Sequence, residues 1–341
     1  MNWLRAIYNF LLLGPLFTTI YAVQSPQVPS LNLPNRELLD IVWDYHLSDF
    51  SQDSYSKAVE VLFTQYETAA NTKLGPGPRG KVGLKVYTAS GPGLATPVPL
   101  TKAVIQALER RGWKSNQIFI LDQSEYQLRQ CGYLPMLGLG GGDKFQNKYD
   151  VYVLESGKYY DPNWFYDSPL PSLEPDAIYS RNWATTYNEG RKSYLPVPLL
   201  LDADYWINLP MVCDLQAIGV GGALANATLW AISNNQRFLQ SEATAPVAVS
   251  EMSAIPELRE RWIFTLMTWQ TYQVAGGPLF NANYCYNEPH LLLSANPVLL
   301  DFVMLEKINP HRKFHRFPTF DPTPKMFDYC QSLGVGPYKG E

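Results

Sequence analysis

The residues best placed for ligand chemistry lie around a glycine-rich turn in the second half of the chain. The stretch YWINLPMVCDLQAIGVGGALANATLWAI, residues 205–232, reads as a buried strand ending near Pro210, then Gly219, Gly221 and Gly222, then a helix. Backbone N–H groups exposed at the start of a helix attract anions. The segment therefore predicts an anion or cofactor site, although close backbone packing would explain the same glycines.

A second loop with glycines follows a predicted strand that carries Lys85. Ser90, Gly91 and Gly93 lie in TASGPGLAT, residues 88–96, directly before a predicted helix. Loops that follow parallel strands share the carboxyl edge of an α/β sheet, where such sheets bind ligands. We therefore expect a crevice between loops 88–96 and 211–224.

Three polar residues could serve a ligand in this crevice. Lys85 would supply the countercharge for an anion, with an outward-facing strand lysine as an equal alternative. Asn208 stands at the end of the central strand, and Asn226 lies in the helix after the glycine turn. These side chains indicate binding of a small anionic molecule, but they assign neither a cofactor nor a reaction.

Metal and nucleophile patterns are weaker. Cys285, Glu288 and His290 supply three ligand types within six positions, but Pro289 and the neighbouring tyrosines favour an ordinary loop, so we predict no metal site. His311 and His315 have helical spacing, yet Pro310 favours a loop there as well. No Gly-x-Ser-x-Gly elbow occurs, and Ser90 is better explained as a turn residue than as a nucleophile. Whether the chain is an enzyme stays open.

An aromatic segment offers a different class of function. Residues 156–198 are rich in Tyr, Trp, Asp and Pro and show little periodicity. A long loop of this kind would suit a lid over the crevice, stacking against a carbohydrate, or simple coverage of the core.

The elements that must position these residues alternate along the chain. We expect helices over 36–47, 54–70, 96–111, 222–239 and 296–308, with others from 124, 255 and 324, and strands over 81–87, 117–122, 150–155, 205–210, 262–269 and 290–295. Thr96 and Asn296 are predicted to cap their helices, and Gly112 to end one. This order predicts an α/β fold: a mixed, mostly parallel sheet with helices on both faces and a long aromatic-rich insertion.

The composition and the N-terminal segment limit the class of partner and the cellular location that we expect. The 341 residues are 46% hydrophobic, and 27 Lys+Arg against 31 Asp+Glu give a net charge of −4, which argues against a nucleic-acid partner. Residues 1–22 read as a signal peptide, residues 23–35 as a proline-rich lead-in and residues 36–341 as one α/β domain. We expect an exported protein, periplasmic or extracellular, without a stable membrane span after cleavage.

The four cysteines leave two possibilities open. Cys131, Cys213, Cys285 and Cys330 are far apart and form no Cys-x-x-Cys motif. Either they form up to two disulfides in an oxidising compartment, or they are buried free thiols.

The order of segments from about residue 81 to residue 310 resembles the uncharacterised family named domain of unknown function 362. Its features are a strand lysine, a Thr-Pro helix start, an Asn-apolar-Pro strand end followed by a glycine turn and an asparagine, and late Gly-Pro and Asp-Pro steps. The matching positions here are Lys85, Thr96-Pro97, Asn208-Leu209-Pro210, Gly219, Gly222, Asn226, Gly277-Pro278, and Asn296-Pro297 with Asp301.

The chain departs from this family where the family carries charge. Cys213 and Leu215 stand where the family has Lys and His, Ala225 stands where a Lys precedes the asparagine, and the iron–sulfur cysteines of some relatives are missing. The resemblance implies a fold and a site location but no substrate. Binding of a small anionic ligand, and a noncatalytic descendant that serves structure or interaction, therefore both remain as hypotheses.

Overall fold

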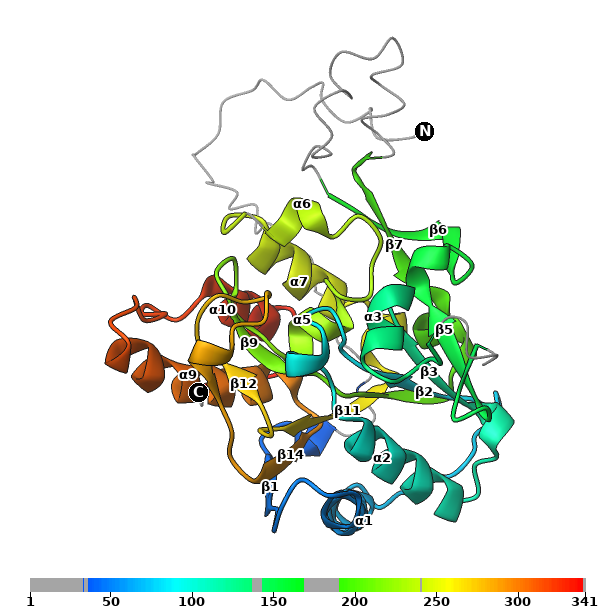
Figure 1. Ribbon diagram of the computed structural model, residues 1–341. Coiled ribbons are helices and arrows are strands. Elements are labelled where there is room, and N and C mark those ends of the chain that lie inside the picture. The colour runs from blue at the N-terminus through cyan, green and yellow to red at the C-terminus, as the bar shows by residue number, and fades with distance from the viewer. Residues whose placement is uncertain (1–32, 34–35, 137–142, 169–189, 240, 340–341) are drawn as a thin grey trace, which may run out of the picture.

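An eight-stranded main sheet organises the computed structural model, which describes residues 33, 36–136, 143–168, 190–239 and 241–339 (Figure 1). Five adjacent strands, β11-β8-β2-β3-β5, are parallel, and antiparallel strands flank them. In sheet order the strands are β1 (Trp43–His46), β14 (His290–Ser294), β11 (Trp262–Thr268), β8 (Tyr205–Asn208), β2 (Val82–Lys85), β3 (Ile118–Asp122), β5 (Tyr149–Val153) and β4 (Lys144–Phe145).

Two smaller sheets complete the strands of the described residues. The second sheet has the order β10 (Gly219–Gly221), β9 (Val212–Leu215), β12 (Tyr272–Gln273) and β13 (Cys285–Tyr286), and the third pairs β6 (Tyr160–Asp167) with β7 (Lys192–Pro196). The helices are α1 (Gln52–Ala69), α2 (Val98–Arg110), α3 (Glu125–Gln130), α5 (Ala223–Ala227), α6 (Gln236–Leu239), α7 (Ala245–Ser253), α8 (Pro256–Arg259), α9 (Pro297–Phe314) and α10 (Lys325–Ser332).

Helices cover both faces of the main sheet, as the sequence predicts. Figure 1 shows α1 and α2 on one side of the sheet and α5 and α7 on the other. Side chains alternate along each strand, so Ile118 and Ile120 pack with α1 and α2, whereas Phe119 and Leu121 pack with α5, α7 and α9. The α/β fold class with its largely parallel sheet is therefore confirmed.

Several predicted element boundaries hold. The strands predicted at 117–122, 262–269 and 290–295 form within one or two residues of their expected limits. Asn296 caps α9, because its side-chain oxygen accepts hydrogen bonds from the backbone N–H groups of Val298 and Leu299. Gly112 follows α2 with φ +97°, a left-handed conformation that a glycine tolerates at a helix end.

The first predicted helix is wrong. Residues 36–47 form only a short 3-10 turn, Arg36–Leu38, followed by β1. Val42, Trp43 and Tyr45 are residues that favour strands, and β1 gains hydrogen bonds by pairing with β14 at the sheet edge. Tertiary pairing outweighs the helical spacing of the leucines.

Other boundaries also differ from prediction. The helix expected over 222–239 is split into α5 and α6, and Thr228, directly after α5, bonds back to the Leu224 carbonyl through its hydroxyl. Thr96 does not cap α2, because its hydroxyl donates to the Leu209 carbonyl and accepts from the Tyr87 amide. The helix expected from 255 is the short α8, and α7 before it was not predicted.

Two segments read as loops contain regular structure. The loop 211–224 holds β9 and β10, which pair as an antiparallel hairpin of the second sheet. Within 156–198, residues 169–189 lie outside the described part, and the flanking segments form the β6–β7 pair. His311 and His315 belong to α9 and its C-terminal cap, so the expectation of a loop there is wrong.

Candidate functional site

The centre of the main sheet contains a change of direction in the chain. From β2 the chain moves outward to β3 and β5, and it later returns to the other side of β2 as β8. Lys85 at the end of β2 lies opposite Asn208 at the end of β8. A reversal of this kind opens a crevice at the carboxyl ends of parallel strands, where ligands bind in open α/β sheets.

Lys85 is wholly buried at this point. Its Nζ donates to the Val86 carbonyl at 2.7 Å, to Asp122 Oδ1 at 2.7 Å and to Asn226 Oδ1 at 3.0 Å. An ammonium has three donors, and protein acceptors satisfy all three. Lys85 therefore has no donor for a ligand, and its predicted role as an exposed countercharge is corrected to that of a buried partner of Asp122.

Asp122 completes a buried ion pair with Lys85. The two side chains are 0% and 1% exposed, and the second carboxylate oxygen accepts from the backbone N–H and the hydroxyl of Thr88, both at 2.7 Å. Burial lowers the pKa of Lys85, and the neighbouring Asp122 carboxylate only partly offsets that effect. The pair fixes the start of loop 88–96 to β3.

The two predicted asparagines join the same network. Asn226 Nδ2 donates to Asn208 Oδ1 at 2.7 Å, and Asn208 Nδ2 donates to the Ala223 carbonyl at 2.8 Å. The sequence thus correctly groups Lys85, Asn208 and Asn226. All three are 0% exposed, so the group holds β2, β8 and α5 together and leaves no surface for a ligand.

The glycine turn before α5 does hold a carboxyl group, but this group belongs to the chain. Asp301 on α9 accepts the backbone N–H of Ala223 at 2.6 Å and that of Leu224 at 2.9 Å. A Cβ on Gly222 would lie 2.2 Å from Asp301 Oδ1, so glycine is needed for this approach. The predicted anion position is therefore filled by an internal carboxylate. Burial raises the pKa of Asp301 to about 7, against the effect of the two N–H bonds.

Gly219 and Gly221 serve packing. Gly219 has φ +86°, and a Cβ there would lie 2.5 Å from the Pro324 side chain. Gly221 pairs with Cys213 across the β9–β10 hairpin. The alternative reading of the glycine turn, close backbone packing, thus describes these two residues.

The first glycine loop packs against residues 276–281. The Ser90 hydroxyl bonds to the Pro278 carbonyl and lies 2.5 Å from the Tyr87 hydroxyl. Gly91 adopts φ +77°, and a Cβ on Gly93 would lie 2.4 Å from the Phe280 ring. Ser90 is held between two protein partners, which fits the turn residue predicted from the sequence.

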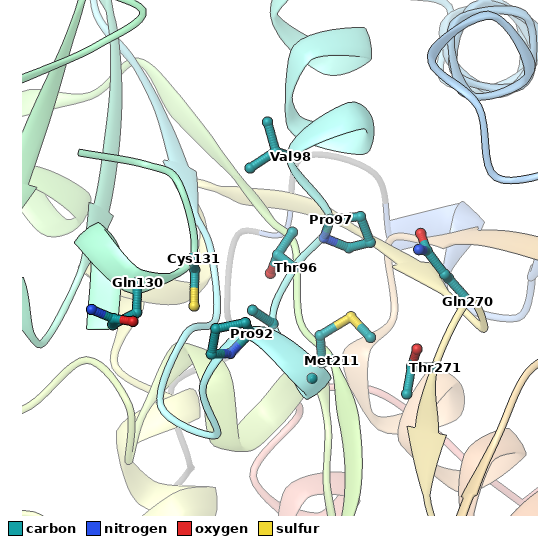
Figure 2. Close-up of a pocket in the computed structure, with 11 residues that line it drawn as sticks. Pro92, Thr96, Pro97, Val98, Gln130, Cys131, Met211, Gln270 and Thr271 are labelled. Atoms are coloured by element: carbon teal, nitrogen blue, oxygen red, sulfur yellow. The ribbon is translucent and has the colours of Figure 1, made fainter. Parts of the chain in front are cut away.

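A small cavity of about 160 Å³ lies beside this loop at the carboxyl edge (Figure 2). Loops that follow β2, β8 and β11 and the end of α3 form its walls. The lining residues are Pro92, Gly93, Ala95, Thr96, Pro97, Val98, Gln130, Cys131, Met211, Gln270 and Thr271. Among the predicted site residues, only Gly93 contributes.

None of the described residues that line this cavity is charged. The Gln270 carbonyl oxygen accepts from Tyr55 at 2.8 Å, which leaves its amide donors available. In the described part of the chain, the side chains of Gln130 and Thr271 form no hydrogen bond with protein. Burial raises the pKa of the Cys131 thiol to about 12, so this group is neutral near pH 7.

The start of α2 also borders the cavity. Pro97 and Val98 line it, and no side chain caps the helix. Pro97 and Pro99 have no backbone N–H, so only Val98 and Leu100 supply donors at this helix start. These two N–H groups lack partners within the helix and carry partial positive charge. The cavity thus combines neutral hydrogen-bonding groups with a weakly positive helix start.

The two predicted loops supply part of this cavity, and the sequence did not indicate the rest of its lining. Met211 was placed in the second glycine loop, and Gln270 and Thr271 follow a strand whose position in the sheet was not predicted. Listing the residues just beyond each strand end would also have found Gln270 and Thr271. Gln130 and Cys131 come from the end of a short helix, and no sequence signal marked their approach.

The predicted aromatic segment is largely engaged with the core. Tyr159 stacks on Tyr152 with ring centroids 4.4 Å apart, and Tyr160 donates to the Ala231 carbonyl. Tyr166 donates to Glu251 at 2.5 Å. These contacts fit coverage of the core by the described part of the segment.

The weak metal candidates do not converge. Glu288 bonds to Tyr272 and Lys307, His290 bonds to Asp44, and Cys285 lies near Gln273 and the Asn281 carbonyl. Among the described residues, no three His, Cys, Asp or Glu side chains are grouped to hold a metal ion. All four cysteines are free thiols in this structure.

None of the helices within the described residues combines the length and the apolar composition needed to cross a membrane. Comparison of the chain with protein-family models, with curated proteins and with solved structures found no match.

Proposed function

We propose that this protein binds a small anionic molecule in the cavity at the carboxyl edge of the main sheet. The observation that carries the proposal is the position of the cavity. It lies beside the point where the strand order reverses, and loops after three neighbouring parallel strands form its walls. Such positions are where open α/β sheets bind ligands.

The cavity limits the ligand in size. Its volume of about 160 Å³ is close to that of an engineered protein cavity that holds benzene. The ligand, or the part of it that enters, therefore has roughly six to eight non-hydrogen atoms. A short hydroxy- or keto-carboxylate has this size.

The residues that line the cavity limit the charge of the ligand. The absence of acidic side chains among the lining residues disfavours a cation. The Val98 N–H at the uncapped start of α2 favours a carboxylate, and the amide of Gln270 and the hydroxyl of Thr271 suit hydroxyl or carbonyl groups. Binding is proposed here, and the lining supplies no group for a defined reaction.

Export and the resemblance to domain of unknown function 362 belong to this proposal as predictions. Both rest on the sequence alone. Residues 1–22, which carry the predicted signal peptide, lie outside the described residues.

Protection of Cys131 tests the proposal directly. The thiol lines the cavity, whereas Cys285, also half-buried, lies on the second sheet outside it. Alkylation by iodoacetamide is followed by mass spectrometry with a panel of short carboxylates, inorganic phosphate and neutral polyols. A ligand in the cavity should slow the labelling of Cys131 severalfold and leave the labelling of Cys285 unchanged.

Two variants sharpen this test. Thr271→Val keeps the side-chain volume and removes a hydroxyl from the cavity, and Thr72→Val makes the same change at an exposed position. Protection should weaken in the first variant only. Equal labelling of Cys131 with and without every panel member would reject the proposal.

A noncatalytic scaffold is the second candidate. The observation that favours it is the internal occupation of the predicted anion positions by Asp122 and Asp301. In that case no panel member protects Cys131, while substitutions in the Lys85 network still destabilise the fold.

A further inference from the structure

Two of the four histidines in the chain face each other at the outer edge of the main sheet. β1 pairs antiparallel with β14, and His46 lies directly opposite His290 in this register. Their rings have centroids 5.1 Å apart and planes at 73°. His46 is exposed and His290 is half-buried, so solvent ions can reach the pair.

We propose that His46 and His290 bind a divalent transition-metal ion, Zn²⁺, Ni²⁺ or Cu²⁺, with one ring nitrogen each. Imidazole nitrogens suit these ions. The site is independent of the ligand cavity, and none of its residues lines that cavity.

The ring separation fits a shared ion. A Zn–N bond of about 2.0 Å plus ~1.1 Å from nitrogen to ring centre places each centroid about 3.1 Å from the ion. At a tetrahedral angle, two such rings have centroids about 5 Å apart. The measured centroid separation of 5.1 Å matches this value.

Asp44 prepares His290 for this role. Its carboxylate oxygens lie 2.8 and 3.0 Å from His290 Nδ1, so Nδ1–H donates to the carboxylate. The lone pair of the neutral ring is then on Nε2. A carboxylate that fixes the second nitrogen of a histidine is the usual support of a metal ligand. Asp44 shares the strand face of His46, because side chains two residues apart point the same way.

The pair supplies two protein ligands. Because the described residues contain no set of three grouped His, Cys, Asp or Glu side chains, water or an external ligand would complete the coordination. This arrangement predicts reversible binding and not a closed structural site.

Metal binding to the tag-free protein tests the proposal. Zn²⁺ binding is measured by calorimetry, and Cu²⁺ binding by electron paramagnetic resonance. One ion per chain and nitrogen hyperfine splitting from two imidazoles are expected. His46→Ala and His290→Gln should each weaken binding at least tenfold, and Asp44→Asn by about tenfold to a hundredfold.

The other two histidines provide a matched control. His311 and His315 bond to Tyr272 and Tyr286 and are also spaced for a metal on a helix. His311→Ala and His315→Ala should leave affinity unchanged. Absence of binding, binding that His46→Ala does not weaken, or binding lost in the controls would overturn the proposal; circular dichroism shows that each variant is folded.

Discussion

At the residue scale, the Lys85–Asp122 pair determines how the centre of the sheet behaves. Two opposite charges are removed from water between β2 and β3, and every polar atom that they present has a partner. Removing one partner from such a pair leaves an uncompensated buried charge, which costs far more than losing an exposed pair.

Lys85→Met should therefore lower the free energy of unfolding by about 3–5 kcal/mol. Lys144→Met is the control, because Lys144 and Asp150 form a half-exposed ion pair and its loss should cost less than about 1 kcal/mol. Urea unfolding measures both. Adding Asp122→Asn to Lys85→Met should recover part of the loss, and equal costs for the two lysine variants would show that the buried pair is unimportant.

At the element scale, α5 depends on a residue from another helix. This helix spans five residues, Ala223–Ala227, and such short helices are marginal alone. Asp301 of α9 binds its first N–H groups, and Asn226 within it binds the Lys85 network. Sequence periodicity cannot reveal the support from Asp301 and Lys85, because these residues lie 77 or more positions away.

Asp301 should make stability depend on pH in a defined direction. Its pKa is raised from 3.8 to about 7 in the folded chain, so the folded state binds this proton more tightly than the unfolded state. Its contribution is full below pH 3.8 and is lost as pH rises toward 7. The Asn side chain in Asp301→Asn does not titrate, so the unfolding free energy of this variant should fall less between pH 4.5 and 7 than that of the natural chain.

Urea unfolding at several pH values tests this expectation. Asp301→Asn should also cost about 1–3 kcal/mol, because one backbone N–H loses its acceptor. Asp321→Asn, at an exposed position, is the control and should leave the pH slope unchanged. A variant slope identical to that of the natural chain would contradict the role assigned to Asp301.

Some of the helices and strands could be predicted from the sequence, and others could not. Buried strands such as β3 and β11 carry a compact apolar run, so they were predicted within one or two residues. β1 was missed because its pairing with β14 joins residues about 245 positions apart. The grouping of Lys85, Asn208 and Asn226 followed from the order of strands. The burial of these three residues could not be predicted from the sequence, because it depends on how α5 and α9 pack above them.

At the scale of the whole molecule, two cores share one sheet. Ile120 packs with α1 and α2, and its neighbour Leu121 packs with the helices on the other face. Separating either layer would expose the opposite sides of the same strands to water. We therefore expect the two layers to unfold together, as a single cooperative unit.

The buried thiols can report this cooperativity. Cys213 and Cys330 lie in the core with α5, α7 and α9, whereas α1 and α2 pack on the other face. Under pulsed alkylation in increasing urea, both thiols should become reactive at the concentration where helical circular dichroism is lost. Labelling of Cys330 at clearly lower urea would instead show that the layer around α10 opens by itself. Four labels per unfolded chain without reductant would confirm that all four thiols are free.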